Sequence, residues 1–178
     1  MKYNDIEFDA IVATPCCGKS YLCDKYPDKF VDVDEVRLRC KYIVPENITR
    51  KELEETKGER TFTRRANREQ YIIDMEKMLD KYVAEGKTLI AAPHQEAIDY
   101  LVKNNIKFAF VFQKKNMKDE IEKRMTNRGN PQSTIKENID MLDEFYIKNT
   151  NENISVVHYE FGENEYLEDI IKLFGYEF

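Results

Sequence analysis

The residues best suited to chemistry stand near the start of the chain, in the run A-T-P-C-C-G-K-S that ends at Ser20. This run follows an apolar stretch, residues 8–12, with the composition of a buried strand. A tight loop at such a junction aims backbone N–H groups at phosphate oxygens, while Lys19 reaches the β- and γ-phosphates and Ser20 ligates Mg²⁺. The pattern therefore predicts a phosphate-binding loop that comprises Ala13, Thr14, Pro15, Cys16, Cys17, Gly18, Lys19, Ser20 and Tyr21.

This loop departs from the common pattern G-x-x-x-x-G-K-[ST] and from its version G-x-P-G-x-G-K-S. Ala13 stands where the first glycine is expected, and Cys16 stands where the second version has glycine. Ala13 adds only a methyl group, whereas Cys16 must adopt a backbone conformation that glycine reaches more easily. The alternative is a chance Gly-Lys-Ser in an ordinary turn, but its place between an expected strand and an expected helix favours a phosphate site.

Length and composition fit a single domain over residues 1–178. The net charge of −6 disfavours a nucleic-acid partner, because binding to phosphate backbones depends on clustered cations. A cationic leader with an apolar stretch is missing, and no apolar run approaches a membrane span, so we expect a cytoplasmic protein that binds no membrane. The expected oligomeric state is a monomer or a homodimer. The cysteines form no C-x-x-C pair. Cys16 and Cys17 lie beside Lys19, which would favour a redox-sensitive thiol, or they simply fit the loop.

Strand-like and helix-like patterns alternate along the chain. Helical spacing of apolar residues occurs over 71–82, 121–125 and 166–174, and Thr134 with Glu137 predicts a capping box for a helix whose inward face is Ile135, Ile139, Leu142 and Phe145. Strands that alternate with helices predict a parallel sheet in a three-layer α/β/α fold. The five expected strands cover residues 8–13, 29–33, 88–92, 108–112 and 154–159.

This order of elements, with its phosphate loop and D-x-D, resembles the P-loop small-molecule kinases, including nucleoside, nucleotide and shikimate-type kinases. Two further segments, A-P-H-Q-E-A at 92–97 and R-M-T-N-R-G-N at 124–130, resemble phage-type and bacterial nucleotide kinase-like proteins. The resemblance covers the whole chain, and the phosphate loop is its one specific motif. It implies a P-loop NTPase fold with strand order 2-3-1-4-5, ATP and Mg²⁺ as cofactors, and acceptor binding in the polar stretch 40–68, which contains the basic group Arg60, Arg64, Arg65 and Arg68.

Asp32 and Asp34 stand in V-D-V-D-E at the end of the second expected strand. Because side chains alternate along a strand, we expect both carboxylates on the same side. In the kinases that the chain resembles, one carboxylate here touches the Mg²⁺ shell through water, and the next positions the acceptor hydroxyl and takes its proton. The resemblance gives Asp32 the first role and Asp34 the second. The alternative is a polar strand end whose Asp caps the following helix.

The third strand ends in A-A-P-H without the Asp of a Walker-B motif. We therefore expect no metal ligand from this strand, and Ser20 with Asp32 can suffice because Mg²⁺ keeps several waters. His94, at the carboxyl end of the strand, is expected to face the ligand crevice, unless it caps or packs against a helix.

Arg124 and Arg128 are four residues apart and share one helix face, with Asn116 as the expected N-cap and a Gly129 turn beyond them. The resemblance implies a lid over 114–132 that brings these arginines to the transferring phosphoryl group. The alternative is a solvated basic face, since the neighbouring lysines are Lys114, Lys115, Lys118 and Lys123.

These residues predict an ATP- and Mg²⁺-dependent phosphotransferase for a small acceptor, a nucleoside or nucleoside monophosphate. Lys19, Asp34, Arg124 and Arg128 are its expected catalytic residues, and Ser20 and Asp32 the expected metal ligands. One alternative is a P-loop NTPase or nucleotide-binding protein without transfer, suggested by the missing glycines and Walker-B Asp. The other is a polynucleotide 5′-kinase, which the basic group favours and the acidic total disfavours.

Overall fold

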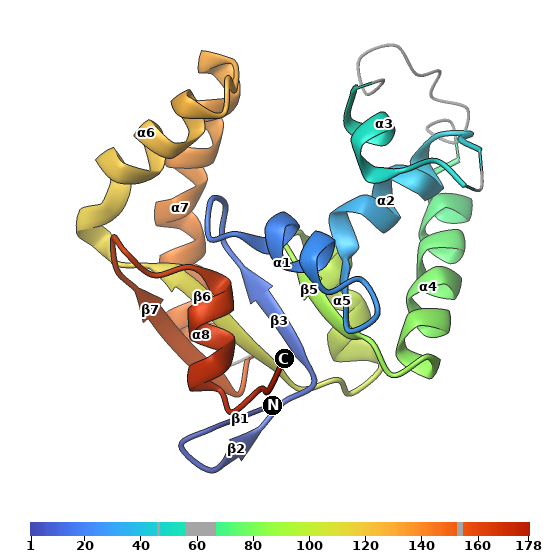
Figure 1. Cartoon of the computed structure of the whole chain (residues 1–178), viewed down its shortest axis with the longest axis horizontal. Coiled ribbons are helices and arrows are strands. Elements are labelled where there is room, and N and C mark those ends of the chain that lie inside the picture. The colour runs from blue at the N-terminus through green and yellow to red at the C-terminus, as the bar shows by residue number, and fades with distance from the viewer. Residues whose placement is uncertain (46, 56–66, 153–154) are drawn as a thin grey trace.

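A parallel sheet forms the centre of the structure, a computed structural model that describes residues 1–45, 47–55, 67–152 and 155–178 (Figure 1). Its order is β4-β5-β3-β6-β7, and all neighbouring strands are parallel. This confirms the α/β fold and the expected order 2-3-1-4-5. The strands are β3 (Ala10–Ala13), β4 (Phe30–Asp32), β5 (Thr88–Ala91), β6 (Phe108–Gln113) and β7 (Val157–Phe161).

Several strand boundaries differ from the predicted ones by one to three residues, and the first strand begins at Ala10, two residues later than expected. The second strand ends at Asp32, and Val33 already opens a helix, because the Asp32 side chain caps that helix. The last strand begins at Val157, three residues later than the expected start, which lies outside the described residues. A short hairpin of β1 (Lys2–Tyr3) and β2 (Ile6–Glu7) precedes the sheet and was not predicted; its turn places Asn4 and Asp5 at positive φ, as a type I′ hairpin requires.

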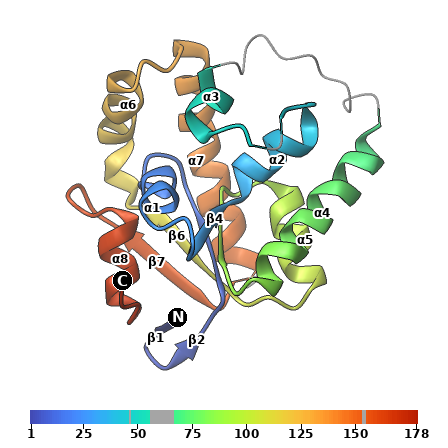
Figure 2. The same cartoon turned by 45° about the vertical axis from the view of Figure 1, so that its right-hand side comes forward.

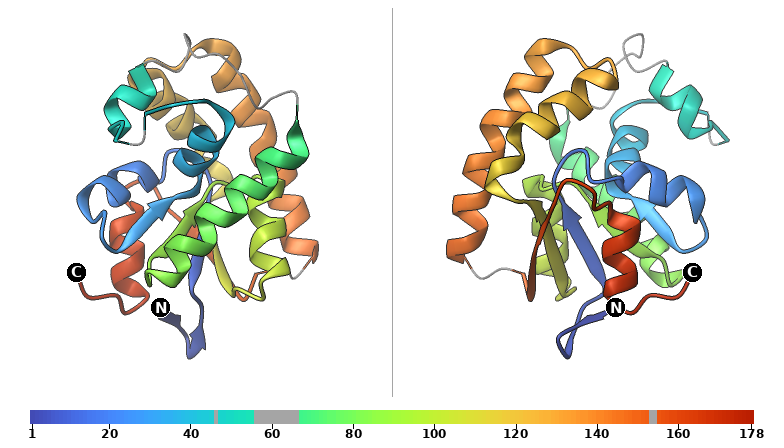
Figure 3. Two further views of the ribbon diagram at one scale, coloured as in Figure 1. Left: turned by 90° about the vertical axis from the view of Figure 1, so that its right-hand side faces the viewer. Right: turned by 60° about the vertical axis from the view of Figure 1, so that its left-hand side comes forward.

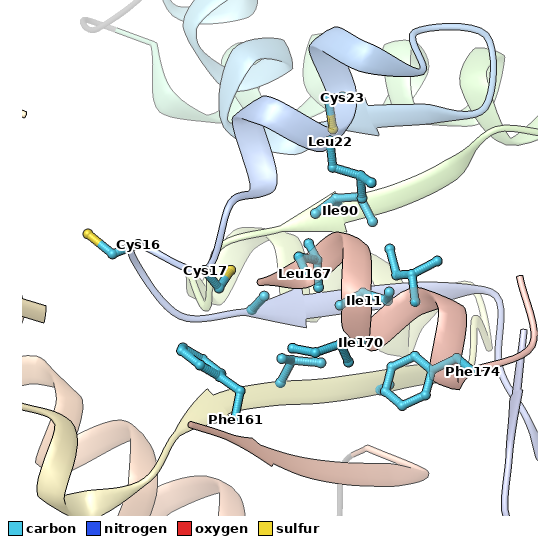
Figure 4. Packing of buried hydrophobic residues seen from close by; sticks show 14 of the residues in the cluster. Ile11, Cys16, Cys17, Leu22, Cys23, Ile90, Phe161, Leu167, Ile170 and Phe174 are labelled. Carbon is cyan, nitrogen blue, oxygen red and sulfur yellow. The ribbon is translucent and has the colours of Figure 1, made fainter. Parts of the chain in front are cut away.

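Helices cover both faces of the sheet, as Figure 2 shows for α8 and α4. Alternate residues of β3 enter two separate cores: Ile11 lies in one and Val12 in the other. The first core receives Leu22, Leu167 and Ile170 (Figure 4), and the second receives buried residues of α2, α4 and α5. The helices are α1 (Lys19–Lys25), α2 (Val33–Lys41), α3 (Arg50–Glu55), α4 (Arg68–Ala84), α5 (Gln95–Lys103), α6 (Lys118–Asn127), α7 (Gln132–Glu152) and α8 (Leu167–Leu173), with a 3₁₀ turn, η1 (Lys115–Met117).

The apolar periodicity predicted α4, α6 and α8, and their buried side chains confirm it. The predicted helix caps were wrong in two cases. The capping box at Thr134 fails because α7 begins at Gln132, directly after Pro131. Asn116 lies inside η1, and α6 starts at Lys118. Ile135 and Leu142 of α7 are buried as expected, whereas the Phe145 side chain lies outside the described residues.

The carboxyl ends of parallel strands meet at one edge of a sheet, and two helical segments rise beside that edge. In Figures 1 and 3 the α6–α7 pair stands on one side of the loop that follows β3, and α2 with α3 stands on the other. The loop therefore lies between two different pairs of helices. Among the described helices, none combines the length and hydrophobicity needed to cross a membrane.

Candidate active site

The loop between β3 and α1 is held from outside through its carbonyl groups. The backbone N–H of Leu167 donates to the Cys17 carbonyl at 2.7 Å, and Arg124 Nη1 donates to the Cys16 carbonyl at 3.2 Å. Before the loop turns, the Thr14 hydroxyl donates to Gln113 on β6 at 2.7 Å. Three segments from later in the chain thus hold the loop, and two of them fix the directions of the Cys16 and Cys17 carbonyls.

The same contacts direct the loop's N–H groups inward. In a trans peptide, the N–H points opposite to the carbonyl of the preceding residue. With the Cys16 and Cys17 carbonyls turned outward, the N–H groups of Cys17 and Gly18 face the concave side. No backbone N–H from Cys16 to Ser20 donates a hydrogen bond to another described residue, although Cys16 and Cys17 are almost fully buried. Buried N–H groups without acceptors are rare, and a row of them forms an anion-binding concavity.

The backbone conformation expected of Cys16 is the one observed. Its φ is 64°, in the left-handed region, and Gly18 has φ 96°. Figure 4 shows the Cys17 side chain turned toward the core near Leu167, whereas Cys16 points away from it. Burial raises the pKa of the Cys16 thiol, and the charges of Arg128 and Lys19 offset this only in part. The thiol is therefore protonated at neutral pH, which does not favour the redox-sensitive site considered from the sequence.

Lys19 and Ser20 lie at the start of α1, where the sequence pattern places them. Lys19 Nζ donates to the carbonyls of Ala13 at 2.8 Å and Thr14 at 2.9 Å, so the ammonium folds over the loop that it is expected to serve. The Ser20 hydroxyl is 3.4 Å from Asp32 Oδ2. The predicted metal ligands are thus brought together.

Asp32 uses its two carboxylate oxygens for different contacts. Oδ1 accepts a hydrogen bond from the Asp34 N–H at 3.0 Å and caps α2, so the helix-cap alternative holds for this residue. Oδ2 faces Ser20 and accepts from Arg50 Nη2 at 2.7 Å, and the Asp32 side chain is 2 % exposed. Sequence reasoning missed Arg50, because it approaches Asp32 only through the fold of the chain after α2.

Asp34 also faces the loop, but not by strand alternation, since it lies in the first turn of α2. His94 Nε2 is 3.3 Å and Arg37 Nη1 is 3.4 Å from its Oδ1. Burial would raise the pKa of Asp34, but the hydrogen bond and charge of His94, with the charges of Lys19 and Arg37, outweigh it and hold the pKa at about 2. Arg37 was not predicted, although its spacing of three residues from Asp34 on a helix is a usable signal.

Two clefts meet over this group of residues. One, of about 330 Å³, lies toward α2 and α4 and includes Arg37 and Tyr71. The other, of about 340 Å³, lies toward α6 and α7 and includes Arg128 and Asn138. Both clefts share one wall, and the shared residues are Lys19, Ser20, Asp34 and His94. A group held in one cleft therefore faces a group held in the other across these four side chains.

The two arginines expected in a lid lie in different environments. Arg124 is buried: besides its bond to Cys16 it donates to the Glu163 carbonyl and, at 2.9 Å, to Glu120, and it lies over the Tyr166 ring. This placement differs from a free lid arginine. Arg128 is exposed and lines the cleft; its backbone N–H donates to the Arg124 and Met125 carbonyls, but its guanidinium makes no hydrogen bond or ion pair with another described residue. The basic group at 60–65 lies outside the described residues, whereas Arg68 pairs with Glu96 at 3.2 Å.

Within the described ranges, no group of three or more His, Cys, Asp or Glu side chains is arranged to hold a metal ion. An alcohol oxygen and a carboxylate oxygen at the Ser20–Asp32 pair are hard ligands of the kind that Mg²⁺ accepts. Mg²⁺ commonly needs only one or two carboxylates when substrate phosphates complete its shell. The pair fits a metal that arrives with a phosphate ligand.

Comparisons with known proteins assign no function. No protein-family model matches the chain, and no curated protein is similar to it in sequence. A solved structure, that of an uncharacterized protein from Eubacterium ventriosum, matches with a TM-score of 0.49 and 15 % sequence identity, covering 94 % of this chain and 98 % of that one.

The depressed pKa of Asp34 predicts a defined acid sensitivity. A carboxyl whose pKa is about 2 in the folded protein and ordinarily 3.8 stabilises the fold above pH 3.8, and this contribution is lost as the pH falls through about 2. We expect Asp34→Asn to flatten the pH dependence of the thermal midpoint in that window. Asp28→Asn, at an exposed carboxylate, is the control; equal slopes in the wild type and Asp34→Asn would contradict the assignment.

The different environments of the two arginines predict different defects. Arg124→Ala should destabilise the protein by about 1–3 kcal/mol, because buried carbonyls lose their donor. Arg124→Lys should recover part of this, since it keeps the charge but not the planar fork. Arg128→Ala should change stability by no more than about 0.5 kcal/mol. Urea unfolding curves measure all three, and equal losses at both positions would show that Arg124 does not hold the loop.

Proposed function

We propose that this protein is an ATP-dependent phosphotransferase that acts on a small acceptor, a nucleoside or nucleoside monophosphate. The observation that carries the proposal is the run of N–H groups from Cys16 to Ser20, which donate to no other described residue; those of Cys17 and Gly18 face the concave side, which the Lys19 ammonium closes. Such a cradle matches the β- and γ-phosphates of a nucleoside triphosphate. Outward anchoring of the carbonyls keeps the N–H groups directed inward before any ligand arrives, which lowers the cost of ordering the loop.

The cleft toward α2 and α4 suits the acceptor. Its walls carry Asp34 beside the loop and the cationic side chains of Arg37 and Lys41, with the aromatic ring of Tyr71 near them. Cations favour an acceptor that bears a phosphate, and a planar ring favours one that bears a base. A nucleoside monophosphate satisfies both features, and a nucleoside satisfies the second.

A neighbouring cleft of about 430 Å³ suits the base of the nucleotide donor. Gly18, Tyr21, Arg128 and Tyr166 line it, and both tyrosine rings are well exposed. Gly18 is part of the phosphate loop, and Arg128 also lines the cleft that contains Cys16 and Lys19. A triphosphate bound to the loop would therefore extend its nucleoside toward these two rings. A side chain at Gly18 would contact Tyr166 and force a residue with φ 96° into strain.

In the proposed transfer, the attacking oxygen is a hydroxyl of a nucleoside or a phosphate oxygen of a nucleoside monophosphate, and Asp34 orients the hydroxyl toward the γ-phosphorus. The acceptor oxygen forms a bond to phosphorus while the bond from phosphorus to the β,γ-bridging oxygen breaks, and that electron pair leaves with ADP. When the acceptor is a nucleoside, the hydroxyl proton passes to Asp34 and then to water; an ionised phosphate oxygen of a monophosphate has no proton to lose. A carboxylate with a pKa near 2 is a weak base, which suits a reaction whose loose transition state needs positioning more than deprotonation. Lys19, and Arg128 from the other cleft, compensate the charge on the phosphoryl oxygens.

Ser20 and Asp32 would hold Mg²⁺, as their hard oxygens and their spacing of 3.4 Å allow. The bound ion would supply neutralisation of the β- and γ-phosphate charge. His94, in the segment between β5 and α5, contacts Asp34 and keeps that carboxylate ionised and in place.

A second candidate function is nucleotide binding or hydrolysis without transfer. It is favoured by the lack of an acid at the end of β5 and by the guanidinium of Arg50 on the Ser20–Asp32 pair. A panel of nucleosides and nucleoside monophosphates, incubated with radiolabelled ATP, separates the two. Labelled acceptor indicates the phosphotransferase; labelled phosphate alone, or bound ATP with no product, indicates the second function.

Lys19→Ala should abolish or strongly weaken ATP binding and leave the fold intact, because among the described residues the ammonium hydrogen-bonds to the loop's own carbonyls alone. Isothermal titration measures the affinity, and circular dichroism checks the fold. Lys77→Ala, at an exposed lysine on α4, is the matched charge control. An unchanged ATP affinity in folded Lys19→Ala would refute the phosphate cradle.

Asp34→Asn should lower kcat by about two orders of magnitude or more and change ATP affinity little, since the carboxylate acts on the acceptor and not on the nucleotide. Steady-state rates with the acceptor found in the panel, together with ATP titration, test this. A defect confined to ATP binding would remove Asp34 from the acceptor side.

A further inference from the structure

The Ser20–Asp32 pair already holds a cation of the protein's own. Arg50 Nη2 is 2.6 Å from the Ser20 hydroxyl and 2.7 Å from Asp32 Oδ2. Its Nη1 is 3.5 Å from both Asp24 and Glu35. The guanidinium therefore contacts the same two oxygens that the proposed function assigns to Mg²⁺.

Arg50 and a metal ion cannot occupy this pair together. An ion about 2.1 Å from both oxygens would lie where the guanidinium nitrogen now sits, and two positive charges would be in direct contact. The Asp32 carboxylate is buried, and its other oxygen, Oδ1, already accepts from the Asp34 N–H and caps α2. Metal binding thus requires Arg50 to leave Ser20 and Asp32.

Two other carboxylates lie close enough to pair with Arg50 after it leaves Ser20 and Asp32. Asp24 and Glu35 lie within 3.5 Å of Nη1, so a small shift exchanges one set of carboxylates for another. The helix that carries it, α3, has six residues, and of its described side chains Leu53 is the buried one. Arg39 also donates to the Ile48 carbonyl just before α3, at 2.9 Å. Within the described part of the chain these attachments are few, and they allow α3 to adjust without disturbing the sheet.

We propose that Arg50 is a resident counter-cation that excludes free divalent metal, so that the metal enters only as a metal–nucleoside triphosphate complex. Free Mg²⁺ gains one alcohol and one carboxylate and must displace a guanidinium that already satisfies both. The triphosphate adds its own oxygens to the metal and also binds the loop N–H groups and Lys19. These additional contacts supply the free energy needed to displace the Arg50 guanidinium. This inference rests on the proposed function for the identity of the complex.

The test titrates Mn²⁺, detected by electron paramagnetic resonance, into the full chain without nucleotide. We expect weak Mn²⁺ binding to the wild type and binding at least about tenfold tighter to Arg50→Ala. The substitution removes the repulsion between the guanidinium and the metal ion, and at contact distance this repulsion is larger than the free energy of a tenfold change in affinity. Lys51→Ala is the matched control: it removes a cation from the same helix, but its side chain is 85 % exposed and lies near Glu55.

A second substitution locates the gained site. Asp32→Asn, combined with Arg50→Ala, should abolish the gain, while asparagine still caps α2. Equal Mn²⁺ affinity in the wild type and Arg50→Ala, or a gain that persists in the double variant, would overturn the proposal. Arg50→Gln, which keeps hydrogen-bonding groups without the charge, takes the place of Arg50→Ala if that variant does not fold.

Hydrogen exchange of the wild type gives an independent reading. Amide protection over Arg50–Glu55 should fall with Mg²⁺ and ATP together and stay unchanged with Mg²⁺ alone; unchanged protection when the complex is bound would count against displacement. The Mn²⁺ titration uses no nucleotide. If ATP does not bind but Arg50→Ala gains the Mn²⁺ site, the proposed function fails while the exclusion of free metal by Arg50 stands.

Discussion

The candidate site depends on two hydrogen bonds that hold the Cys16 and Cys17 carbonyls outward. Their donors, Arg124 on α6 and the N–H of Leu167 at the start of α8, come from the second half of the chain. Without them the peptide planes could rotate, and the N–H groups could find acceptors within the loop. The concave row of free N–H groups is therefore a product of tertiary structure, although the residues that form it are contiguous in sequence.

The two aspartates of this site have basic partners before any ligand is present. Asp32 pairs with Arg50, and Asp34 pairs with Arg37 and His94. The Asp32 side chain is buried and needs a partner, since an unpaired buried charge is costly, whereas Asp34 is half-buried. Ligands that enter must therefore exchange contacts and not simply fill a space. Arg128, exposed in the cleft, makes no ion pair with the described residues and has no such contact to give up.

The sequence allowed prediction of what depends on local pattern. The strands, the loop and the left-handed conformation of Cys16 follow from apolar runs, motif spacing and the missing glycine, and the strand order followed from the family resemblance. It did not allow prediction of partners that meet through the fold. Arg50 reaches Asp32 from a polar stretch without periodicity, and Arg124 reaches Cys16 across 108 positions. The same limit explains Asp34, whose direction is set by the helix that Asp32 caps.

That cap also bears on the missing Walker-B acid. The residues at the end of β5 are alanines, but Asp32 ends the neighbouring strand β4, level with Ile90 of β5. Because Oδ1 is fixed by the Asp34 N–H, Oδ2 points toward Ser20 in one orientation. One carboxylate thus both starts α2 and presents a single oxygen to the site. The proposed metal, held by so few protein oxygens, must take most of its ligands from phosphates and water, so its affinity depends on a bound nucleotide. Arg50 would increase this dependence, because a metal without nucleotide would have to displace its guanidinium from Ser20 and Asp32.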